Sequence, residues 1–107
     1  MINRETFRKM KAGVVFVNVS RGTLVDTDAL IEALKSGHVR AAALDVLDPE
    51  PINPDNPLLK MNNVIITPHA ASVSAKAVRT LRESVAKTVL CAIRGEPLPN
   101  IVNGVTQ

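Results

Sequence analysis

The stretch Gly13–Asp26, with the sequence GVVFVNVSRGTLVD, decides the fold of this chain. Its first part, Val14–Val19, is a nearly unbroken run of β-branched and aromatic residues, which is typical of a strand buried on both faces in a parallel sheet. We expect this strand to be a central one. Arg21 follows it, and Gly22 lets the backbone turn tightly. Because open α/β sheets bind ligands at the carboxyl ends of their strands, Arg21 is the first candidate for chemistry.

The sequence around this stretch alternates between helix and strand patterns. Apolar residues at helical spacing predict helices over residues 4–10, 27–34 and 73–94. Short apolar runs predict strands at Ala41–Val46 and Val64–Thr67. Several prolines exclude regular structure from residues 48–57. The alternation predicts an α/β fold with about three parallel strands and right-handed crossovers.

Composition limits the function classes. The chain has 107 residues, enough for one small core, and its hydrophobic and charged fractions are ordinary for a globular protein. The net charge of +3 is spread over the predicted helices and Trp and Tyr are absent, so we expect no nucleic-acid binding. No apolar run approaches the ~18 residues of a membrane span and no signal peptide is visible, so we expect no membrane partner and a cytoplasmic location. The single Cys91 lies on an apolar helix face, where we expect a packed thiol.

Polar groups follow each of the predicted strands. Ser20–Gly22 come after the first, Asp45 and the loop to Glu50 after the second, and His69 after the third. In a parallel sheet these ends share one edge, so the groups should converge there. Taken singly, each has an ordinary explanation. Arg21 would be a solvated surface group, Glu50 an exposed loop residue, His69 a packing residue and Asp45 a turn cap.

The joint arrangement indicates proton transfer. Histidine gains and loses a proton near neutrality, and Glu50 beside His69 would stabilise the imidazolium and fix the ring tautomer. Arg21 offers a planar fork that suits two oxygens of a carboxylate or a 2-oxo acid. No nucleophile accompanies them, and we expect no metal. The set suits carbonyl reduction or alcohol oxidation, in which a cofactor supplies the hydride and the protein handles one proton.

Three segments carry a resemblance to a known family. VNVSRGTLVDTDALIEALKSG, AAALDVLDPEP and NVIITPHAA resemble the D-isomer-specific 2-hydroxyacid dehydrogenases, which include D-lactate, glycerate and 3-phosphoglycerate dehydrogenases and the C-terminal-binding corepressors. The resemblance extends from Ile2 to about Asn103. It implies half of a Rossmann-type doubly wound parallel sheet, NAD as the cofactor with NADP not excluded, and a small 2-hydroxy or 2-oxo acid as the substrate.

The resemblance also implies roles for individual residues. Arg21 matches the arginine that binds the substrate carboxylate, Glu50 the family's paired glutamate, and His69 the catalytic acid–base. By analogy, His69 would protonate the carbonyl oxygen of a 2-oxo acid as hydride arrives from NADH. The positions that match cofactor-binding residues are Val19, Ser20, Arg21, Asp45, His69 and Ala71. Among these, Asp45 matches the aspartate that contacts the nicotinamide carboxamide.

Two features of the family are absent from this sequence. One is the G-x-G-x-x-G turn that holds the pyrophosphate, with its acidic ribose-binding residue ~20 positions later. The other is the separate substrate domain. We therefore expect residues 1–107 to form a single partial nucleotide-binding domain that binds NAD weakly and turns over little or no substrate alone.

The sequence also bears on two further questions: whether the chain associates with itself and whether it is an enzyme. The strand Val14–Val19 would present an apolar edge, so we expect a homo-oligomer, most simply a dimer, formed through that edge or by exchange of the last helix. The alternative to an enzyme is a non-catalytic NAD-sensing or dimerisation module like the corepressors. The presence of Arg21, Glu50 and His69 together favours the enzyme.

Overall fold

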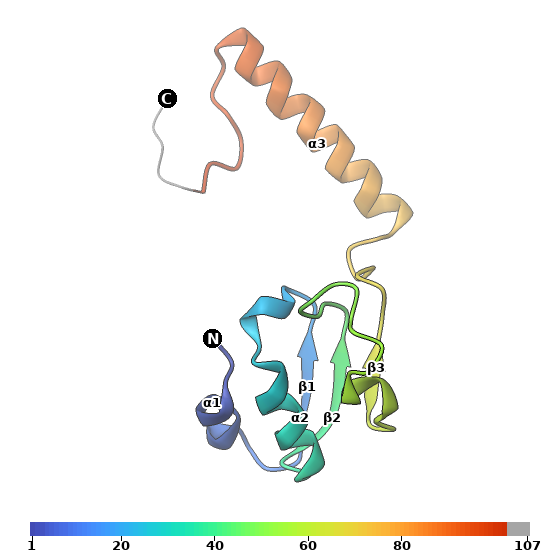
Figure 1. Cartoon of the computed structure of the whole chain (residues 1–107). Coiled ribbons are helices and arrows are strands. Elements are labelled where there is room, and N and C mark those ends of the chain that lie inside the picture. Colours follow the sequence, from blue (N-terminus) through green and yellow to red (C-terminus); the bar gives the residue numbers. More distant parts are fainter. Residues whose placement is uncertain (103–107) are drawn as a thin grey trace. The chain divides into compact units, whose positions relative to one another are not determined.

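A parallel sheet forms the centre of the first part of the chain. The computed structural model describes residues 1–102, and the chain divides into two compact units, Met1–Ala71 and Ser72–Gln107. The first unit contains a three-stranded parallel sheet in the order β1-β2-β3 (Figure 1). Its strands are β1 (Val14–Asn18), β2 (Val39–Leu44) and β3 (Val64–Ile66). The α/β fold with a parallel sheet is therefore confirmed.

Two helices and two short turns complete the first unit. They are α1 (Arg4–Lys9), the 3₁₀ turn η1 (Gly22–Leu24), α2 (Thr27–Lys35) and the 3₁₀ turn η2 (Pro57–Lys60). Both helices begin at a side chain that accepts hydrogen bonds from the first-turn N–H groups. Asn3 does so for α1 and Asp26 for α2. The boundaries therefore follow capping chemistry that is visible in the sequence.

The core lies on one face of the sheet, where α2 packs against β2. The largest fully buried side chains are Phe7, Leu30, Val39, Val46 and Leu58. Burying each of the larger ones contributes about 1.5–3 kcal/mol relative to an exposed position. Phe7 also contacts Phe16 of β1 edge to face, with ring centroids 5.3 Å apart. Core packing thus fixes α1 and α2 against the strands whose ends carry the site.

Within this sheet β2 is the central strand and β1 lies at an edge. The exposed edge expected for Val14–Val19 is therefore confirmed, and a central position for this strand within the chain is not observed. The expectation that β1 is buried on both faces is wrong, because Val15 and Val17 are 45% and 59% exposed while Asn18 is buried. The core covers one face of this sheet, so alternate side chains of the apolar run point away from it. An unbroken apolar run in the sequence does not show which face of the strand is covered by other residues of the chain.

The second unit is described by itself. Helix α3 (Ala75–Arg94) begins at Ser74, whose hydroxyl accepts from the Ala77 N–H, and ends at Gly95 in the left-handed conformation. None of its residues, all of which the structure describes, is buried. Cys91 is half-buried within this unit, so the packed thiol expected there stays a prediction.

Within residues 1–102, none of the helices has both the length and the apolar composition that a membrane span needs.

Candidate active site

The loops after β2 and β3 bring Glu50 and His69 together. Nδ1 of His69 lies 2.9 Å from Oε2 of Glu50, and the other carboxylate oxygen accepts from the Leu47 backbone N–H at 2.8 Å. Prolines on both sides of Glu50 restrict the backbone that carries it. The Leu47 N–H bond, followed by the His69 bond, holds the pKa of Glu50 below its ordinary value. Glu50 is therefore a carboxylate that orients the imidazole through one ring nitrogen.

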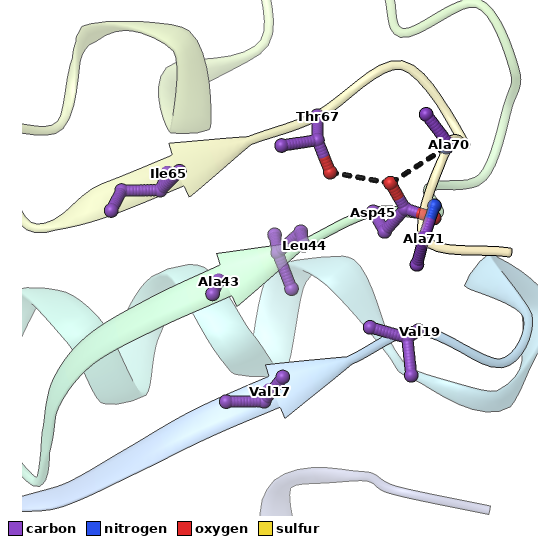
Figure 2. A pocket seen from close by; sticks show the side chains of 9 residues that line it. All are labelled: Val17, Val19, Ala43, Leu44, Asp45, Ile65, Thr67, Ala70 and Ala71. Carbon is purple, nitrogen blue, oxygen red and sulfur yellow. Dashed lines mark hydrogen bonds between the residues drawn. The ribbon is translucent and has the colours of Figure 1, made fainter. Parts of the chain in front are cut away.

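Asp45 is the buried carboxylate of the site. It follows β2 directly, is 6% exposed, and accepts three hydrogen bonds from the segment after β3. The donors are the Thr67 hydroxyl and the backbone N–H groups of Ala70 and Ala71 (Figure 2). The Thr67 hydroxyl, and next the Ala71 N–H, hold the pKa of Asp45 below its ordinary value. Asp45 is thus ionised and faces donors from another strand.

A small hollow opens beside Asp45. Its volume is about 240 Å³, and Figure 2 shows its lining of Val17, Val19, Ala43, Leu44, Asp45, Ile65, Thr67, Ala70 and Ala71. All but two of these side chains are apolar. The volume is below the ~300–1,000 Å³ of pockets that enclose a whole drug-sized ligand. It therefore suits a flat apolar ring with a polar substituent directed at Asp45.

A second hollow, of about 430 Å³, borders the Glu50 and His69 pair. Asp45 and Thr67 line both hollows. The remaining lining residues are Leu47, Glu50, Pro51, Ile52, Ile66, Pro68 and His69. The Glu50 and His69 pair therefore lies next to open space large enough to admit a small molecule.

Arg21 is only partly brought into this arrangement. It follows β1, is exposed, and its Nη1 donates to the Ser20 carbonyl oxygen at 2.7 Å. Its positive charge nevertheless contributes to the low pKa of Glu50. The structure therefore joins Glu50 to His69 directly, and places Arg21 close enough to interact with Glu50 through charge.

The predicted cofactor positions divide in the same way. Val19, Asp45 and Ala71 line the smaller hollow, whereas Ser20 and Arg21 lie on the adjoining turn and His69 lines the larger hollow. Ser20 donates its backbone N–H to the Asn18 side chain. The positions predicted from the family pattern thus occupy one edge of the sheet.

Gly22 has a different role from the one expected. It does not adopt a positive φ, and a Cβ at this position would overlap the Leu47 carbonyl group. The turn after β1 therefore packs directly on the backbone of the loop that leads to Glu50. This close approach, which only glycine permits, places Arg21 beside that loop.

Asn18 is a residue that the sequence analysis missed. Its side chain is buried, accepts the Ser20 N–H at 3.1 Å and donates to the Arg21 carbonyl at 3.0 Å. Its own carbonyl accepts from the Asp45 N–H at 2.9 Å. An amide residue that interrupts an apolar run two residues before Ser-Arg-Gly was the available signal.

No group of three or more His, Cys, Asp or Glu side chains within residues 1–102 could hold a metal ion.

Known proteins resemble this chain over nearly its full length. It is 48% identical to the glyoxylate reductase of Korarchaeum cryptofilum over 103 residues, which are 96% of this chain and 31% of that protein. A crystal structure of a D-isomer specific 2-hydroxyacid dehydrogenase from Xanthobacter autotrophicus Py2, in complex with NADPH and MES, matches with a TM-score of 0.85 and 40% identity. That match covers 95% of this chain and 41% of the other.

D-lactate dehydrogenase with NAD⁺ from Lactobacillus jensenii matches with a TM-score of 0.79 and 34% identity, over 96% of this chain and 35% of that one. This chain therefore spans less than half the length of each of these proteins. The sequence profile of the family described as D-isomer specific 2-hydroxyacid dehydrogenase, NAD binding domain, matches residues 1–71, which include every predicted site residue. The chain belongs to the D-isomer specific 2-hydroxyacid dehydrogenase family, and the match lies in that family's NAD-binding domain.

Proposed function

We propose that this chain carries the proton-transfer groups and the nicotinamide site of an NAD(P)-dependent oxidoreductase that interconverts 2-oxo and 2-hydroxy acids. The observation that carries the proposal is the pairing of Glu50 with His69 beside the hollow that Asp45 lines. Residues 1–107 are, on this proposal, a partial nucleotide-binding domain. The similarity to a glyoxylate reductase favours a small 2-oxo acid as substrate.

His69 supplies the proton. Because Nδ1 faces Glu50, Nε2 is the nitrogen that can meet a substrate oxygen. The carboxylate of Glu50 favours the Nδ1–H tautomer and orients the ring, so Nε2 of His69 can donate a proton to the carbonyl oxygen and recover it in reverse. Glu50 therefore acts by orienting the imidazole.

Arg21 binds the substrate carboxylate. A guanidinium forms two parallel hydrogen bonds with a carboxylate, which also fixes the orientation of the carbonyl group. Its present partner is the Ser20 carbonyl, a neutral acceptor that a substrate anion can replace. The Arg21 side chain is exposed and therefore open to such an anion.

The nicotinamide fits the smaller hollow. Val19 and Ala71 supply apolar contact surface, and Asp45 supplies carboxylate oxygens that accept amide N–H donors. When bound, the cofactor supplies the hydride. Solved relatives were crystallised with NADPH and with NAD⁺, and we propose NAD as the cofactor without excluding NADP.

We also propose that the chain forms a homo-oligomer, most simply a dimer, in the cytoplasm. The exposed apolar side chains of β1 and β3, with Val15, Val17 and Ile65 between 45% and 67% exposed, favour association. Val17→Lys should shift the sedimentation coefficient towards that of the monomer at high concentration, whereas Thr23→Lys should not. Wild type that sediments as a monomer at every concentration would contradict this.

The experiment for the function uses the two histidines of the chain. With the imidazole carbons labelled, NADH and glyoxylate are added up to millimolar concentration while the ring signals of His69 and His38 are followed by NMR. We expect the His69 signals to shift and the His38 signals to stay unchanged. His38 is the control because its ring contacts the Phe7 carbonyl, which is far from the site residues in the sequence. Shifts of both rings, or of neither, would refute the proposal.

Binding should be weak, because the sequence contains no G-x-G-x-x-G turn for the pyrophosphate. Calorimetric titrations of NADH, and of glyoxylate in the presence of NADH, therefore accompany the NMR measurement, with His69→Gln, Arg21→Ala and the distal His38→Gln as variants. Loss of glyoxylate binding in Arg21→Ala alone would identify the carboxylate site. Equal losses in His38→Gln would show that the effect is not local.

A further inference from the structure

His69 has an uncommon backbone conformation. Its φ is +53°, in the left-handed region that residues other than glycine seldom occupy. Such a conformation is unfavourable for a residue with a side chain and persists only where the surroundings hold it. The segment Thr67–Ala71 must therefore be held by contacts outside His69 itself.

The hydrogen bonds on both sides of His69 lead to one side chain. Asp45 Oδ1 accepts from the Thr67 hydroxyl at 2.5 Å and from the Ala70 N–H at 2.8 Å, and Oδ2 accepts from the Ala71 N–H at 2.9 Å. Donors before and after the strained residue thus converge on a single carboxylate. Hydrogen bonds to an ionised acceptor are roughly twice as strong as those between neutral groups.

Asp45 is itself fixed by the sheet. Its N–H donates to the Asn18 carbonyl at 2.9 Å, and the Thr67 N–H donates to the Leu44 carbonyl at 3.0 Å. At 6% exposure the carboxylate has little room to follow a moving loop. The turn is therefore held to a rigid point at the end of β2.

We infer that Asp45 is a positioning residue that holds Thr67–Ala71 as a clamped turn, keeps His69 in its left-handed conformation and so presents the imidazole to Glu50. This role is separate from any contact of Asp45 with a cofactor. Its consequence for proton transfer rests on the proposed function, whereas the clamp itself exists without substrate or cofactor.

Substitutions separate the clamp from the charge of Asp45. Asp45→Asn keeps the size but replaces one acceptor oxygen with an N–H₂ group, which would face a donor. Thr67→Val keeps the carboxylate and removes one donor, and Thr67→Ser keeps that donor. These variants change the number of bonds to the turn without changing Glu50 or His69.

The test is NMR of the full 107-residue chain without ligands. In Asp45→Asn we expect the Ala70 and Ala71 amides to exchange with solvent about tenfold faster or more, as loss of a charge-assisted bond implies. The strong HN–Hα cross-peak within His69 that marks a positive φ should weaken. Unchanged exchange together with an unchanged cross-peak would overturn the inference.

A second readout follows the Glu50 carboxyl group. Loss of the His69 bond should raise the pKa of Glu50 towards its ordinary value, because that bond helps to hold it low. Removal of the Asp45 charge alone would lower the pKa of Glu50 instead, so the direction of the change distinguishes the two effects.

The Thr67 pair guards against a variant that fails to fold. Thr67→Val should show smaller changes of the same direction, and Thr67→Ser should restore wild-type exchange. Equal behaviour of Thr67→Val and wild type would overturn the inference even where Asp45→Asn does not fold. Since no cofactor or substrate is added, a failure of the proposed function would leave these results unchanged.

Discussion

The turn after β1 and the turn after β3 are each held by one buried polar side chain, but the two side chains differ. Asn18 is neutral, is the last residue of the strand that leads into its turn, and bonds Ser20 and Arg21 as both acceptor and donor. Asp45 is ionised, directly follows the neighbouring strand β2, and its carboxylate only accepts. The Arg21 turn is thus organised locally, whereas the His69 turn depends on the assembled sheet. The contact of Gly22 with Leu47 joins the first turn to the loop between them.

The largest effect should come from removing that contact. Gly22→Ala would place a methyl group on the Leu47 carbonyl, and overpacking of this kind costs about 1–3 kcal/mol or more. Urea unfolding should show this loss, and the low pKa of Glu50 should move up because its Leu47 partner shifts. Thr23→Ala, an exposed neighbour, should change stability little. If Gly22→Ala unfolds at the same urea concentration as wild type, the turn at Gly22 and the loop at Leu47 can move apart without loss of stability, which contradicts the prediction.

A smaller effect should follow from changing the neutral side chain into a charged one. Asn18→Asp keeps the acceptor for Ser20 but sets an oxygen against the Arg21 carbonyl, and a buried unsatisfied group costs about 1–3 kcal/mol. The free energy of unfolding, measured in urea at neutral pH, should fall accordingly. Asn3→Asp is the matched control, because Asn3 caps α1 and aspartate caps about as well. Similar losses in both variants would contradict the assignment.

The smallest effect should be on pH dependence, and it should separate the two turns. Asp45 and Glu50 have pKa values below their ordinary ones in the folded chain. Their contribution to stability is therefore complete above the unfolded values of ~4 and is lost as pH falls through the lower folded values. Unfolding free energies should decrease from about pH 5 downwards, and Asp45→Asn should flatten this decrease. A decrease just as steep in Asp45→Asn would show that other carboxylates cause it.

Sequence reasoning reached the parts of the site that depend on strand order. Parallel strands place their carboxyl ends together, so the meeting of Glu50 and His69 could be expected from the pattern alone. It did not reach the partners of Asp45, because hydrogen bonds to Thr67, Ala70 and Ala71 depend on the path of the chain after β3. Local spacing contains no information about that path.

The fold shows the same division. Caps such as Asn3 and Asp26 act within a few residues, and the helix starts were correspondingly accurate. The exposure of one face of β1 was not predicted. An apolar run shows that a strand can be buried, but not whether other parts of the chain cover it. The packed thiol at Cys91 likewise stays a prediction, since an apolar helix face does not show what packs on it.

The bond between Ala71 and Asp45 lies at the last residue of the first unit. A force that pulls on the chain from Ser72 onward therefore acts first on Ala71 and on its hydrogen bond to Asp45. The Asp45 carboxylate thus holds the last residue of the first unit, two residues after His69. A shortened chain that ends at Ala71 would keep every proposed site residue. Its free carboxyl terminus would then be the residue whose N–H bonds Asp45.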